Sequence, residues 1–147
     1  MTRAELITAY RRDGFAIARQ LFSAAEIDAL LDAFNDLATL ADGLVVGLPD
    51  GDEATPCMHR GAQFVLSRDG TRARIHRVVW CGAASPPLLN VGADPRILQL
   101  TTDALGHDEF DQLINQAHFK MPGDDVAFPW HQDSVHRRYG TPLWTDV

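Results

Sequence analysis

Apolar residues recur every three or four positions between residues 24 and 40, which predicts an amphipathic helix. Ser23 and Glu26 stand three residues apart at its start, in the form of a capping box. A second helix is expected from Asp94, an N-cap followed by proline, to Gly106. Two helices with apolar faces are therefore predicted, one on each side of the middle of the chain.

The N-terminal residues predict a further helix and a short strand. Thr2 and Glu5 form another capping box, and Gly14 is the expected end of the helix that follows. The next four residues, Phe15–Ala18, are short and apolar and predict a strand. Residues 41–60 are rich in Gly, Pro and Asp without a clear period, so we expect a long irregular loop there.

Alternating patterns predict strands in the second half of the chain. The segments Gln63–Leu66 and Arg74–Trp80 flank a turn signal at Asp69-Gly70. Residues 112–121 have a period of two, which places a mostly apolar set on one face of a strand. The opposite face then carries Gln116, His118 and Lys120. Helices on one side of a mostly antiparallel sheet, an α+β fold in a single domain over residues 1–147, are the expected architecture.

Composition excludes some classes of function. Hydrophobic residues make up 46 % of the 147, enough for a core, and the net charge is −7 without a Lys/Arg-rich run. That balance argues against a nucleic-acid partner or an anionic membrane surface. Cys57 and Cys81 do not form a CxxC pair, which favours a reducing cytoplasm, and no apolar run is long enough to span a membrane.

A candidate metal site lies in Pro129–Arg137, where His131 and Asp133 are two residues apart. Residues at i and i+2 of a strand point to the same side, so both side chains can reach one ion. An imidazole, a carboxylate and one distant histidine form the facial triad of non-haem Fe(II) oxygenases. A hydrogen-bonded polar loop is the alternative. The similar motif at His107 and Glu109 follows a helix end, and we expect it to be solvated.

Two further segments bear a family resemblance. Gln116–Gly123 followed by Trp130-His131-Gln132-Asp133 resembles the phytanoyl-CoA dioxygenase family, in which a strand ending in Lys-x-Pro-Gly leads to Trp-His-Gln-Asp. The start is similar as well, with Tyr10-x-x-Asp13-Gly14-Phe15 before the helix that opens at Phe22-Ser23. The resemblance covers nearly the whole chain, and its specific part is the last thirty or so residues.

The resemblance implies a double-stranded β-helix (jelly-roll, cupin-like) core and a hydroxylase that uses Fe(II) and 2-oxoglutarate as co-substrate. His131 and Asp133 would be metal ligands and catalytic. Gln116 and Arg77 would contact 2-oxoglutarate, against the alternatives of polar packing on the sheet and a surface cation. His118 and Lys120 are more consistent with structural hydrogen bonds.

By the same resemblance, the distal histidine and a 2-oxoglutarate-binding arginine are expected downstream of Val147, so we expect the N-terminal half of a longer domain with only its first strands. His136 has the wrong strand parity to join His131 and Asp133. Two other readings stay open. One is a non-catalytic domain that oligomerises through exposed strand edges, and the other is a different cupin-like metalloenzyme. The substrate, a small organic or lipid-like molecule, is not specified by the sequence.

Overall fold

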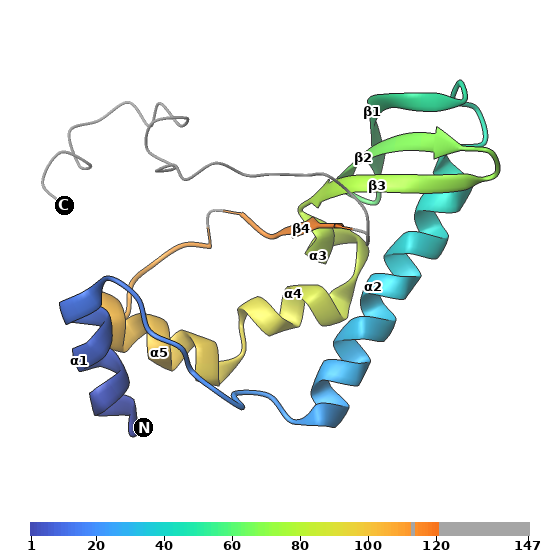
Figure 1. Ribbon diagram of the computed structural model, residues 1–147. Coiled ribbons are helices and arrows are strands. Elements are labelled where there is room, and N and C mark those ends of the chain that lie inside the picture. Colours follow the sequence, from blue (N-terminus) through green and yellow to red (C-terminus); the bar gives the residue numbers. More distant parts are fainter. Residues whose placement is uncertain (113, 121–147) are drawn as a thin grey trace, which may run out of the picture.

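The computed structural model describes residues 1–112 and 114–120 (Figure 1). Its elements run in chain order α1 (Arg3–Asp13), α2 (Ala24–Leu44), β1 (Gly51–His59), β2 (Ala62–Asp69), β3 (Arg72–Val79), α3 (Cys81–Ala84), α4 (Pro86–Gly92), α5 (Pro95–Leu105) and β4 (Gln116–His118). The strands form one antiparallel sheet in the order β1-β2-β3-β4. The predicted α+β class is confirmed. The double-stranded β-helix stays a prediction, because one four-stranded sheet does not define that fold.

The helix ends follow the capping signals. In α1, Thr2 Oγ1 accepts from the Glu5 backbone N–H at 3.3 Å, while Glu5 Oε2 accepts from the Thr2 backbone N–H at 2.7 Å. Ser23 and Glu26 make the same reciprocal pair at the start of α2. Both capping boxes are therefore confirmed, and they satisfy backbone donors that have no partner within the helix.

The apolar run Phe15–Ala18 is not a strand, so that prediction is wrong. The segment is an irregular connection between α1 and α2, and the side chains of Phe15 and Ile17 are 66 % and 56 % exposed. A strand needs a neighbour to pair its backbone groups, and within the described residues the ladder runs only between β1, β2, β3 and β4. A short apolar run without such a neighbour stays irregular.

The prediction of a long irregular loop over residues 41–60 is also wrong. Helix α2 continues to Leu44, because buried Ala41 and Val45 extend the apolar stripe of Leu37 at a spacing of four residues. Strand β1 then occupies most of the remainder. It tolerates Pro56 because β1 is the first strand of the sheet order, where a missing backbone N–H costs no ladder bond on the outer side.

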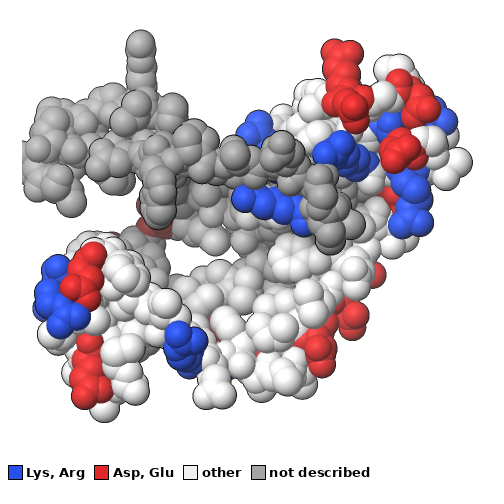
Figure 2. Space-filling view, viewed as in Figure 1, with Lys and Arg blue, Asp and Glu red and all other residues white. Residues whose placement is uncertain are grey.

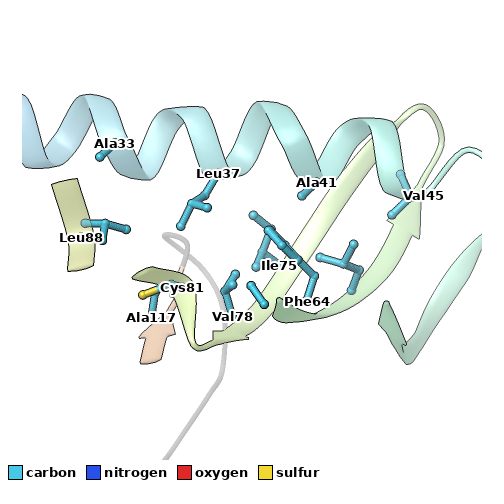
Figure 3. Packing of buried hydrophobic residues seen from close by; sticks show 12 residues of the cluster. Ala33, Leu37, Ala41, Val45, Phe64, Ile75, Val78, Cys81, Leu88 and Ala117 are labelled. Atoms are coloured by element: carbon cyan, nitrogen blue, oxygen red, sulfur yellow. The ribbon is translucent and has the colours of Figure 1, made fainter. Parts of the chain in front are cut away.

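The core lies between α2 and one face of the sheet. Figure 3 shows Leu37 and Ala41 of α2 pointing toward Phe64 of β2 and Val78 of β3. Phe64 and Val78 have no exposed surface. Ala117 of β4 is also part of this cluster, which confirms the apolar parity predicted for that strand; Leu113 and Met121 of the same pattern lie outside the described residues. None of the helices in residues 1–112 and 114–120 combines the length and hydropathy needed to cross a bilayer.

Asn115 joins β4 to the two short helices. Its Oδ1 accepts from the Gly82 backbone N–H at 2.7 Å and from the Cys81 thiol at 2.8 Å, and its Nδ2 donates to the Leu88 carbonyl at 3.2 Å. A Cβ on Gly82 would lie 2.9 Å from the Leu89 Cα, so this approach requires glycine. Burial of Cys81 raises the pKa of its thiol, which therefore stays protonated and able to donate. Both Cys57 and Cys81 are free.

Arg96 links the N-termini of α2 and α5. Its guanidinium lies 2.6 Å from Glu26 Oε1 and 2.7 Å from Asp94 Oδ2, and it stacks 4.5 Å above the centroid of the Phe22 ring. It also donates to the Leu21 carbonyl at 2.9 Å. The hydrogen bonds from Arg96 are the largest cause that lowers the pKa of Glu26 and of Asp94 to about 2 each. The two helices are thus tied together by paired charges.

Stability should fall in acid because of this cluster. The pKa of Glu26 is lowered from an ordinary 4.5 to about 2. Its contribution to the free energy of unfolding is therefore complete above pH 4.5 and is lost as the pH falls toward 2. We expect the thermal unfolding midpoint to drop over that window, and to drop less in Arg96→Ala. Circular dichroism melts between pH 6 and 2.5 would measure this, with the exposed Arg19→Ala as control. An equal drop in all three proteins would contradict the assignment.

Candidate functional site

The sheet has a second face, turned away from α2, that we call the site face. Antiparallel partners share a face, so the pairings define two rows across the four strands. The first row is Pro56, Val65, Arg77 and His118, and the second is Met58, Gln63, Val79 and Gln116. Val65 and Val79 are absent from the core cluster, which confirms that this face is separate from the one packed on α2.

Arg77 and Gln116, the two residues predicted to contact a co-substrate, lie together on the site face. Arg77 is directly opposite His118 on the neighbouring strand, and Gln116 is two residues along from His118. The Gln116 amide hydrogen bonds to the His118 imidazole. Arg77 is exposed, and no described side chain forms a hydrogen bond or ion pair with it. The arrangement therefore offers a guanidinium, an amide and an imidazole within one cross-strand neighbourhood.

Charges around the sheet are mixed, whereas α2 is acidic. Figure 2 shows basic and acidic side chains over the sheet and acidic ones along the exposed side of α2. Arg74, earlier on β3, lies 3.5 Å from Asp52 of β1, whose side chain is 93 % exposed, so this pair contributes little. Lys120 follows His118 at the strand parity of the site face and is exposed. An anion approaching the end of the sheet near β4 would meet Arg77 and Lys120 in a chain that is acidic overall.

A groove of about 530 Å³ lies elsewhere, between α2 and β3. Its walls include Thr39 from α2, Arg72 and Ile75 from β3, and Phe119. Neither Arg77 nor Gln116 lines it, because those side chains are on the opposite face of the sheet. The candidate chemistry therefore belongs to the site face and not to this groove.

The predicted metal ligands, His131 and Asp133, lie outside the described residues, as does His136. Within residues 1–112 and 114–120, no three His, Cys, Asp or Glu side chains are grouped so that they could hold a metal ion. His107 and Glu109 of the similar motif are exposed beyond the end of α5, as predicted. Among the described residues, Arg77 and Gln116 offer a cation and an amide, two groups that can bind a carboxylate.

Sequence reasoning predicted the shared face of Gln116, His118 and Lys120, which the β4 pairing supports for the first two. It did not predict that Arg77 pairs with His118, because strand order and register depend on contacts between distant segments. One signal in the sequence could have indicated this pairing: each of the two strands has a face that carries polar and basic residues.

Comparison with known proteins gives one positive result. The profile of the phytanoyl-CoA dioxygenase (PhyH) family matches residues 10–143. No curated protein and no solved structure matches the chain significantly. The matched residues include α2, the whole sheet, and the segment that carries His131 and Asp133. Because the match covers most of the 147 residues, the chain belongs to the phytanoyl-CoA dioxygenase family.

Proposed function

We propose that the chain carries part of the active site of an Fe(II)- and 2-oxoglutarate-dependent oxygenase that hydroxylates a small organic or lipid-like substrate. Family membership supports an oxygenase, and proteins of this family depend in general on Fe(II) and 2-oxoglutarate. The observation that carries the proposal is the pairing of Arg77 with His118 beside Gln116. Gln116 and His118 lie on β4, which precedes the predicted ligands His131 and Asp133 in the sequence, and Arg77 faces them from β3.

Each residue has a distinct proposed role. His131 would contribute an imidazole nitrogen and Asp133 a carboxylate oxygen as metal ligands. Arg77 would hold a carboxylate of 2-oxoglutarate through charge-assisted hydrogen bonds, and the Gln116 amide would donate a further bond. The bound iron and co-substrate would supply the oxidising power from O2 that attacks an unactivated C–H bond. The residues of the chain would bind and orient the iron and 2-oxoglutarate, which would carry out the oxidation.

The proposal predicts a spectroscopic signal under anaerobic conditions. Fe(II) and 2-oxoglutarate should together give a weak visible charge-transfer band with the parent chain, and Asp133→Ala should lose it, because a carboxylate ligand is removed. Absorbance titration at a fixed iron concentration measures both. Glu109→Ala is the matched control, since it removes a carboxylate from the exposed His-x-Glu motif.

One result would contradict the proposed metal ligand, and a second would contradict binding of both groups by this chain alone. A band of parental intensity in Asp133→Ala would show that this carboxylate does not bind the metal. A folded parent with no band at saturating concentrations would show that the chain alone does not hold iron and 2-oxoglutarate together.

A further inference from the structure

Strand β3 contains a β-bulge at His76. Val65 pairs with Arg77, but the next residue of β2, Leu66, pairs with Ile75, so His76 has no partner on β2. Ile75 and Val78 are both buried in the core although they are three residues apart, a spacing that a regular strand would place on opposite faces. His76 is the extra residue that shifts the alternation of β3, so Ile75 and Val78 both face the core. As a result, His76 lies next to Arg77 on the site face.

The imidazole of the bulged residue is held by a buried hydroxyl. Ser67 Oγ lies 3.0 Å from His76 Nε2, and either atom can donate according to the tautomer of the ring. Ser67 is 1 % exposed, and the strand pairing places it opposite Arg74, on the same face as Val65. A buried hydroxyl without a partner is costly, so this bond fixes the bulge from the neighbouring strand.

We propose that Ser67 and His76 act as a positioning pair that sets the direction of Arg77 toward the carboxylate of 2-oxoglutarate. This inference rests on the proposed function, because it takes Arg77 as the contact of the co-substrate. β-Bulges re-aim side chains and bend the strand that carries them. Here the bend falls immediately before Arg77, and the Ser67–His76 bond prevents the extra residue from shifting to another position along β3.

The test follows the Arg77 side chain directly. In the metal-free chain, millimolar 2-oxoglutarate should shift the Arg77 Nε–Hε signal in a ¹H–¹⁵N spectrum, which yields an apparent Kd. We expect Ser67→Ala and His76→Ala to raise that Kd about threefold to tenfold, the equivalent of one hydrogen bond. His76→Gln, whose amide can reach the Ser67 hydroxyl, should restore the parental value.

A matched control separates positioning from a general loss of stability. Thr101→Val removes a comparable hydroxyl bond, 3.0 Å to the Ile97 carbonyl in α5, remote in sequence from β3. It should leave the Arg77 response unchanged. An equal Kd in the parent, Ser67→Ala and His76→Ala would overturn the positioning pair while leaving the Arg77 contact intact. An Arg77 signal that does not respond in the parent would overturn the proposed contact and the inference with it.

Discussion

Alanine at position 64 is expected to lower the free energy of unfolding by about 3–5 kcal/mol, as removal of a buried phenylalanine side chain usually does. Phe64 has no exposed surface and lies in β2, opposite Cys57 of β1 and Val78 of β3. It points toward α2 in Figure 3, so the cavity would open where the helix meets the sheet. Urea unfolding followed by circular dichroism measures the change.

The control for this prediction is Phe15→Ala. Phe15 is 66 % exposed, so its removal should change the free energy of unfolding by about 0.5 kcal/mol or less. Phe64→Leu keeps most of the volume and should cost clearly less than alanine, which guards against a variant that does not fold at all. A loss below about 1 kcal/mol for Phe64→Ala would mean that Phe64 is not at the centre of the core.

Alanine at Asn115 is the second substitution with a large expected effect, about 2–4 kcal/mol of unfolding free energy. The change would remove the acceptor of the Gly82 N–H at 2.7 Å and the donor to the Leu88 carbonyl at 3.2 Å. A buried group left without a partner costs about 1–3 kcal/mol, and two such groups are affected. Chemical denaturation of the variant and the parent would give the difference.

Asn35→Ala is a suitable comparison, because Asn35 is exposed on α2 and the same amide is deleted. Its effect should stay within about 0.5 kcal/mol. Equal losses in Asn35→Ala and Asn115→Ala would show that the three contacts of Asn115 do not tie β4 to α3 and α4.

Local signals in the sequence were sufficient for the starts of α1, α2 and α5, but not for the end of α2 or for α3 and α4. Thr2, Ser23 and Asp94 are N-caps whose side chains bond to backbone groups within three residues, so their role depends on few distant contacts. The β2–β3 hairpin follows for the same reason, since its turn at Gly70 joins adjacent segments. Such interactions join residues that are close in the sequence, so they can be predicted from a short segment.

Features set by distant contacts were not predicted. The period of two places Asn115 on the mostly apolar face of its segment. Its role depends on Gly82 and Leu88, which approach it only in the folded chain. The bulge at His76 was missed because a strict period of two would put Arg77 on the same face as Ile75. For the candidate site, the family resemblance indicated Arg77 and Gln116 singly, and the register of β3 with β4 brought them together. The ligand roles of His131 and Asp133 stay predictions.

The order of the strands has a consequence for folding kinetics. β1, β2 and β3 are joined by short turns, whereas 36 residues, 80–115, separate β3 from β4. Closing a longer loop costs more entropy before any contact compensates it, so the three-stranded meander should form before β4 is added. During synthesis, the meander can pair as soon as Val79 is available, but Arg77 has no cross-strand neighbour on that side until His118 has been made. The arginine and imidazole pair is therefore among the last parts of the described sheet to assemble.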